Sequence, residues 1–78
     1  MTRNKAAAEY RRLRAIFITR QRAMCTIYGS RATVETFDTD AARYLNDVCG
    51  YDRTPANFVY AARAMLTKLM SDDEATNA

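Results

Sequence analysis

Two glycines and one proline divide this chain, and they constrain its fold more than any other feature of the sequence. Gly29 and Gly50 are the only glycines, and Pro55 is the only proline. Glycine is favoured just after the last residue of a helix, and proline is favoured at the first helical position, where its missing N–H costs nothing. These residues therefore predict three helices, with breaks at Gly29 and between Gly50 and Pro55.

The first predicted helix runs from about Asn4 to Tyr28. Alanines 6–8 favour helix, and arginine and leucine follow in good numbers. Apolar residues then recur at three- and four-residue spacing, which is typical of an amphipathic helix. They are Tyr10, Leu13, Phe17, Met24 and Ile27 or Tyr28. Such a helix would be about 36 Å long, so we expect its N-terminal end, within residues 1–12, to fray or project.

Residues 30–37 are predicted to form a loop, because β-branched and aromatic side chains from Thr33 to Phe37 favour extended structure. Val34 and Phe37 also fit the helical spacing of the residues that follow, and we expect both to pack inward. Asp38 or Thr39 should cap the second helix, which ends near Cys49. Its expected buried face consists of Ala41, Tyr44, Leu45 and Val48.

The third predicted helix has the clearest start, with Thr54 as its N-cap and Pro55 as its first residue. We expect it to end near Met70 or Ser71 and to be followed by a disordered acidic tail, residues 71–78. Its apolar stripe consists of Phe58, Val59, Ala62, Met65, Leu66 and Leu69.

The predicted fold is all-α, with a long basic N-terminal helix packed on a two-helix hairpin. A chain of 78 residues forms one domain at most, here residues 1–70. Domains this short bury a small fraction of their surface and are marginally stable alone. They often gain stability from an oligomer or a partner.

The composition argues against an enzyme. The chain has no histidine, the commonest general acid or base, and no catalytic motif. Cys25 and Cys49 are fewer than the four ligands of a structural zinc site, and we interpret both as buried apolar residues. Asp38 and Asp40 are expected to complement the positive end of the second helix. We therefore predict no catalytic residue, no cofactor and no metal.

The location of the protein is also predicted from composition. No apolar run approaches the roughly 18–20 residues of a membrane span, and Arg11, Arg12 and Arg14 interrupt any signal-peptide core. We expect a soluble cytoplasmic protein with neither a membrane partner nor a small-molecule substrate.

The charge is distributed unevenly along the chain. Residues 1–31 carry eight basic residues and one acidic residue, a net charge of +7. Residues 32–78 carry four basic and eight acidic residues, a net charge of −4. This asymmetry suggests an acidic or polyanionic partner for the basic half.

Arginine and tyrosine dominate the predicted contact surface, and both are enriched at the energetic centres of protein interfaces. Arginine also suits bidentate pairing with carboxylate or phosphate. Our candidate partner-binding residues are Arg3, Lys5, Tyr10, Arg11, Arg14, Arg22, Tyr51 and Arg53. The preferred hypothesis is a regulatory module that binds a larger, partly acidic protein assembly.

Two other function classes remain open. The basic helix could lie along nucleic-acid phosphates, or residues 39–70 could form a helix-turn-helix-like pair. The candidate base readers in that pair are Arg53, Thr54, Asn57 and Arg63, although this half of the chain is net acidic. The third class is a small structural subunit that self-associates through its helices.

In general character the chain resembles small bacteriophage accessory proteins that bind and redirect host machines, RNA polymerase among them. The resemblance rests on the basic leading segment, Thr2 to Arg22, and on one compact helical body, Val34 to Met70, without catalytic residues. The resemblance implies an arginine-rich helix that docks on a large host complex, with the transcription machinery as the best guess. It carries over no individual functional residue.

Overall fold

The three helices predicted from the sequence are present in the computed structural model, which describes residues 2–24 and 32–77, and side chains as far as Ser71. Helix α1 spans Arg3–Met24, α2 spans Val34–Arg43 and continues as a π-helical segment, η2, over Tyr44–Cys49, and α3 spans Pro55–Asn77. No strand occurs in these ranges. None of the helices, over the same ranges, combines the length and apolarity that a membrane crossing requires.

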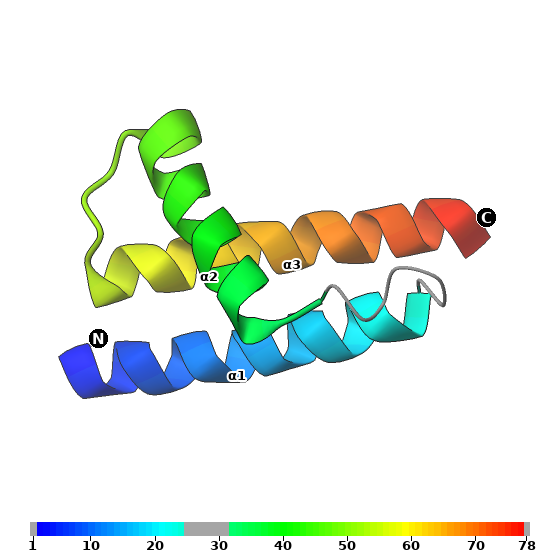
Figure 1. Ribbon diagram of the computed structural model, residues 1–78, viewed down its shortest axis with the longest axis horizontal. Helices are drawn as coiled ribbons and strands as arrows, with labels where there is room; N and C mark the ends of the chain where they lie inside the picture. Colours follow the sequence, from blue (N-terminus) through cyan, green and yellow to red (C-terminus); the bar gives the residue numbers. More distant parts are fainter. Residues whose placement is uncertain (1, 25–31, 78) are drawn as a thin grey trace.

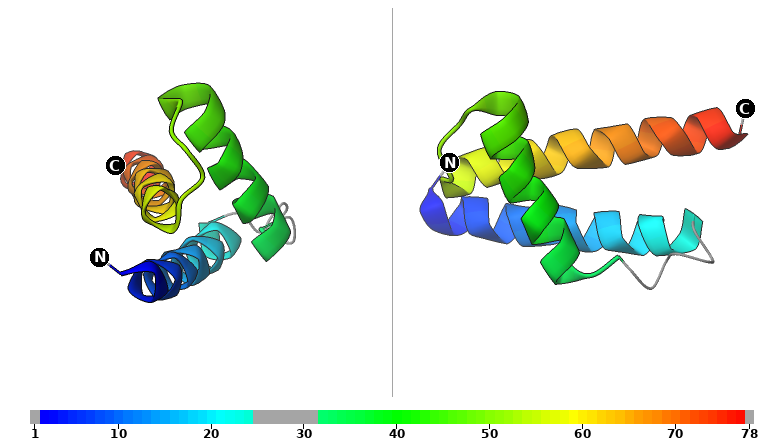
Figure 2. Two further views of the ribbon diagram at one scale, coloured as in Figure 1. Left: turned by 90° about the vertical axis from the view of Figure 1, so that its left-hand side faces the viewer. Right: turned by 45° about the horizontal axis from the view of Figure 1, so that its top comes forward.

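Helices α1 and α3 lie side by side and run in the same direction (Figure 1). Helix α2 crosses both of them, and the connection from Gly50 to Thr54 then returns the chain to the end where α1 begins (Figures 1 and 2). The amino ends of α1 and α3 therefore lie together at one end of the molecule. This arrangement matches the predicted packing of a long N-terminal helix on a helical hairpin.

The core is small and rich in alanine. Half of its buried residues are alanines, which lie on all three helices. Among the side chains that the structure describes, Leu45 is the only large one that is fully buried. Aromatic rings surround this centre, with ring centroids 5.7 Å apart for Tyr10 and Phe37 and 5.0 Å apart for Phe17 and Phe37. Small residues permit close helix packing, but they bury little apolar area for stabilisation.

Local capping explains the helix ends that the sequence predicted. The Thr54 hydroxyl accepts a hydrogen bond from the Asn57 N–H at 3.2 Å, and Pro55 is the first residue of α3. Gly50 ends η2 with a φ of 67°, a left-handed conformation that suits glycine. These ends of the second and third helices are confirmed. The predicted end of the first helix, at Tyr28 and Gly29, lies outside the described residues.

The predicted loop over residues 30–37 is wrong from Val34 onward. Helix α2 begins at Val34, and its cap is Thr33, whose hydroxyl accepts a hydrogen bond from the Thr36 N–H at 3.1 Å. Neither Asp38 nor Thr39 is the cap. The β-branched residues are helical because Phe37 is buried in the core, and this packing outweighs their local preference. Val34, expected to point inward, is exposed.

The buried face of the second helix also differs from the prediction at its end. Ala41 and Leu45 are buried as expected, but Val48 is 70% exposed. In a π-helix each backbone N–H bonds five residues back, so each residue advances the helix by a smaller angle. The N–H groups of Gly50 and Tyr51 both donate to the Leu45 carbonyl. The wider turn rotates Val48 away from the core and onto the surface.

The third helix is longer than predicted. Its apolar stripe packs inward, with Val59 and Ala62 buried, and Ala61 joins them. The helical backbone continues to Asn77, beyond the expected end near Met70 or Ser71. No glycine or proline follows Pro55 to interrupt it. The residues that we predicted as a disordered acidic tail therefore form the last turns of α3, except Ala78, which lies outside the described residues.

Replacing Leu45 with alanine is expected to lower the free energy of unfolding by about 2–5 kcal/mol, because it empties part of the core. The matched change Val34→Ala removes an exposed side chain and should cost less than about 0.5 kcal/mol. Urea unfolding of both variants measures the difference. Equal losses would contradict the placement of Leu45 inside and Val34 outside.

Candidate interaction site on α1

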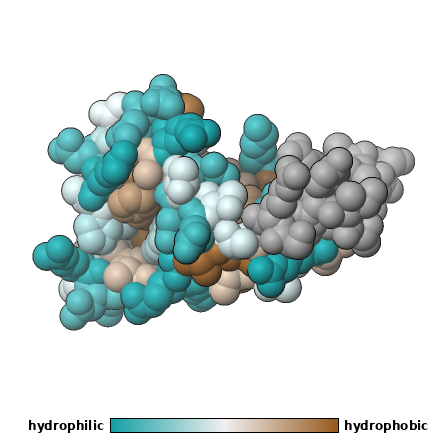
Figure 3. All heavy atoms as spheres, in the orientation of Figure 1, coloured by the Kyte–Doolittle hydropathy of each residue, from teal (hydrophilic) through white to brown (hydrophobic). Residues whose placement is uncertain are grey.

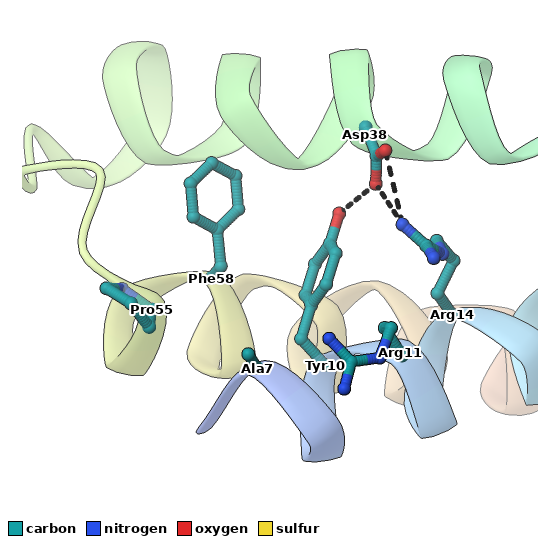
Figure 4. Close-up of a pocket in the computed structure, with 7 residues that line it drawn as sticks. All are labelled: Ala7, Tyr10, Arg11, Arg14, Asp38, Pro55 and Phe58. Carbon is teal, nitrogen blue, oxygen red and sulfur yellow. Dashed lines mark hydrogen bonds and ion pairs between the residues drawn. The ribbon is translucent and has the colours of Figure 1, made fainter. Parts of the chain in front are cut away.

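An open groove lies where the first turns of α1 meet α2 and the start of α3. Its volume is about 450 Å³. We call it the α1 groove, and its lining residues are Ala7, Tyr10, Arg11, Arg14, Asp38, Pro55 and Phe58 (Figure 4). Apolar and aromatic side chains contribute most of its surface, with charged groups among them. Three of its residues, Tyr10, Arg11 and Arg14, are among the predicted partner-binding candidates.

Asp38 of α2 holds the polar side of this groove together. The Tyr10 hydroxyl donates a hydrogen bond to its carboxylate. Arg14 Nη1 donates to both of its oxygens, at 3.1 and 3.2 Å (Figure 4). The Arg14 guanidinium carbon also lies 5.5 Å from the centroid of the Tyr10 ring, within the range of a cation–π contact. One carboxylate thus joins α2 to two successive turns of α1.

Burial and the Asp38 carboxylate together raise the pKa of the Tyr10 phenol well above its ordinary value near 10. Burial disfavours the phenolate, and the neighbouring carboxylate both accepts the phenolic proton and repels a negative oxygen. The ring itself packs edge-on to Phe58, with centroids 5.5 Å apart. Tyr10 is therefore a neutral hydrogen-bond donor near neutral pH, and its hydroxyl is already engaged within the protein.

Arg11 differs from Arg14 in its surroundings. Its side chain is exposed, and its guanidinium does not point toward Asp38 in Figure 4. No hydrogen bond or ion pair joins it to another described residue. The charge of Arg14 is neutralised by Asp38, whereas the charge of Arg11 remains available at the edge of an apolar groove.

The end of the molecule next to this groove has a positive field. The amino ends of α1 and α3 lie there together, and neither helix has an acidic residue in its first turn. The partial positive charges of two helix dipoles therefore add to the charges of Arg3 and Lys5, which are both exposed. This arrangement favours negatively charged groups.

The remaining candidate residues lie in separate places. Arg22 Nε donates to the Ala32 carbonyl at 3.0 Å, so it joins the end of α1 to the segment before α2. Arg53 is exposed in the connection before α3. Tyr51 is exposed as predicted and packs against Tyr60, with ring centroids 5.9 Å apart. Tyr60 is itself 50% exposed.

Three of the four candidate base readers make contacts inside the protein. Thr54 caps α3, and the Asn57 side-chain amide donates to the Asp52 carbonyl at 2.8 Å. Arg63 lies 3.9 Å from the Glu9 carboxylate of α1. Arg12 also bonds this carboxylate and lowers the pKa of Glu9. The second helix of a DNA-reading pair must enter the major groove of DNA. Helix α3 packs along α1, so it is less available for such a contact.

Asp38 and Asp40 do not mark the start of a helix as predicted. Helix α2 begins at Val34, so both lie in its middle, and Glu35 is the acidic residue of its first turn. Cys49 is a free, partly buried thiol, and Cys25 lies outside the described residues. Within the described residues, no group of three or more histidine, cysteine or acidic side chains could hold a metal ion.

Sequence reasoning missed Asp38, Pro55 and Phe58 as parts of this site. Asp38 is 28 residues from Tyr10 and 24 from Arg14 in the sequence. No local pattern encodes such a contact. The apolar spacing of residues 34–48 was the available signal, since a helix starting at Val34 places Asp38 about one turn after its first residue.

No protein-family model, curated protein or solved structure matches this chain. Its function must therefore be inferred from the geometry and electrostatics of the described residues.

A double-mutant cycle on Tyr10→Phe and Asp38→Ala should show a coupling of about 1 kcal/mol in the free energy of unfolding, because each change removes one partner of the same hydrogen bond. Pairing Tyr10→Phe with Asp40→Ala provides the control, and these two effects should add. Chemical unfolding of the single and double variants measures both cycles. Additivity in the Asp38 cycle would show that the contact contributes nothing to stability.

The raised pKa of Tyr10 predicts a loss of stability at high pH. Above about pH 10, tyrosine in the unfolded chain loses its proton while folded Tyr10 keeps it, so the free energy of unfolding falls as pH rises. Urea unfolding between about pH 9 and 11 should show a shallower fall for Tyr10→Phe than for the unmodified protein. Tyr44, whose pKa is also raised, is common to both proteins. Identical slopes would contradict this environment for Tyr10.

Proposed function

We propose that this protein is a non-enzymatic interaction module that binds an acidic segment of a larger protein assembly through the α1 groove. The observation that carries the proposal is Arg11, an exposed cation without a partner among the described residues, beside a groove of largely apolar surface. A matching ligand combines an apolar side chain for the groove with a carboxylate for Arg11.

Charge supports an acidic ligand. Arg3, Lys5 and Arg11 lie on the first turns of α1, where the positive ends of α1 and α3 also lie. The planar guanidinium of arginine can bond both oxygens of a carboxylate at once, which the ammonium group of lysine cannot do in the same geometry. Charge complementarity of this kind accelerates association and excludes basic partners.

The apolar surface supports a protein rather than a free anion. Ala7, Pro55 and Phe58 line the groove from two helices, and the Tyr10 ring lies between α1 and α2 (Figure 4). Burial of an apolar anchor supplies affinity that charge pairs at a solvated rim do not. Asp38 already bonds Arg14 and Tyr10 in the absence of a ligand, so the groove wall keeps its shape. Such preorganisation lowers the entropy lost on binding.

A large regulatory complex is the kind of assembly that this surface suits, and the transcription machinery remains our specific proposal for it. The proposal draws on the resemblance to bacteriophage accessory proteins and on the basic face of α1. Nucleic acid is the competing ligand for that face, since phosphates would also pair with Arg3, Lys5 and Arg11. Nuclease treatment distinguishes the two.

The first experiment is a tagged pull-down from a bacterial lysate, with and without nuclease, followed by a binding assay with purified RNA polymerase. We expect a defined protein complex to survive nuclease treatment. Loss of all specific proteins after nuclease, with nucleic acid bound in the untreated sample, would instead establish nucleic-acid binding. Binding of other assemblies without RNA polymerase would refute the transcription assignment alone.

Charge reversal at Arg11 tests the groove itself. Arg11→Glu should weaken binding of the captured partner by about tenfold or more, because it places a carboxylate against the acidic ligand. Arg20→Glu is the matched control, since it makes the same change on the same helix nine residues later, on the opposite side of α1. Titration of both variants with the purified partner, at one salt concentration, measures the effect.

Equal weakening by Arg11→Glu and Arg20→Glu would show that binding depends on the total charge of the protein and not on contacts at the α1 groove. Arg14 is unsuitable for this test, because its reversal would place two carboxylates together and disturb the fold.

A further inference from the structure

We infer that a second copy of this chain covers a different groove, formed by α2, η2 and α3, and that the protein self-associates through it. This α3 groove lies on the other side of α2 from Asp38. Asp40 and Arg43 line it from α2, Tyr44 and Val48 from η2, and Met65 and Lys68 from α3. The inference is independent of the α1 groove and of its ligand.

The floor of the α3 groove is apolar and exposed. Val48 is the most exposed large apolar residue of the described chain, at 70%. It lies beside Tyr44 and Met65 in the groove. Tyr60 extends the same surface, since its ring centroid is 6.4 Å from that of Tyr44. The π-helical turn that rotates Val48 out of the core therefore creates an apolar surface that a partner can cover.

The mixed charges at the rim fit a second copy better than a partner that carries charges of one sign. Asp40 and Asp47 are acidic, and Arg43 and Lys68 are basic. No ion pair joins any of the four to another described residue. A partner that carries only positive or only negative charges would be repelled by two of these four residues. In a two-fold interface the same surface meets itself, so the acids of one copy can face the bases of the other.

The thin core provides a reason for self-association. Half of the buried core residues are alanines, and over residues 2–24 and 32–71 Leu45 is the only large side chain that is fully buried. Chains of this size commonly gain their missing stability from oligomers. Burying Val48, Tyr44 and Tyr60 against a second copy would add apolar contact next to Leu45. The fold would then be more stable at higher protein concentration.

Sedimentation equilibrium of the full chain, from about 1 μM to about 1 mM, tests the inference. We expect a monomer–dimer equilibrium and a melting temperature that rises with concentration. Val48→Asp should weaken dimerisation by tenfold or more. Val34→Asp, the same change at an exposed valine outside the groove, should leave it unchanged within about twofold.

Two rim variants test charge complementarity without assuming which residues pair. One carries Asp40→Lys and Asp47→Lys, which makes the rim wholly basic, and the other carries Arg43→Glu and Lys68→Glu, which makes it wholly acidic. Each alone should remain monomeric, because like charges oppose each other across the two-fold axis. An equimolar mixture should form a heterodimer, and this recovery also shows that both variants fold.

A monomer over the whole concentration range would overturn the inference. So would a dimer that Val48→Asp and Val34→Asp affect equally, or folded rim variants that do not associate when mixed. If circular dichroism shows that the rim variants are unfolded, the comparison of the two valine changes decides the matter.

Discussion

The packing of α1 along α3 is the contact on which the rest of the structure depends. Buried alanines on both helices, Ala6, Ala61 and Ala62, allow close packing and leave little volume for large side chains. Because the two helices run in the same direction, the chain must return between them, and α2 with its connection makes that return (Figure 1). The same parallel arrangement brings two positive helix ends together beside Arg11.

Hydrophilic side chains cover much of the face shown in Figure 3, and apolar patches show between them. Part of this exposure follows from the small core. A chain in which half of the buried core residues are alanines cannot bury all of its aromatic and branched side chains. Tyr51, Tyr60 and Val48 remain at the surface. Val48 lies together with Tyr44 and Met65 in one groove, and contiguous exposed apolar surface of this kind marks interaction sites.

The helices were predictable where their signals are local. Gly50, Thr54 and Pro55 fix two helix ends through backbone conformation and capping, which depend on near neighbours. The start of α2 was not predictable from propensity, because Phe37 is held in a helix by contacts with α1 that lie far away in the sequence. Val48 was placed inside because a regular α-helix was assumed through residues 44–49.

The sequence predicts which basic residues belong to the candidate site, but not which of them bind within the protein and which remain free for a partner. The sequence identified the basic residues of α1 as a group. The position of Asp38 separates Arg14, which holds α2, from Arg11, which remains exposed. That distinction requires a carboxylate from a different helix, and no spacing within α1 encodes it.

Asp38 and Asp40 line different grooves from opposite sides of one helix, and this has a consequence for binding strength. If two copies join through the α3 groove, each keeps its own α1 groove open, and the dimer is bivalent. A partner with repeated acidic segments would then be held at two points at once. The second attachment is intramolecular, so the combined avidity can exceed that of one site by about 10²–10⁴. Weak individual sites on a small protein are then sufficient to hold a large assembly.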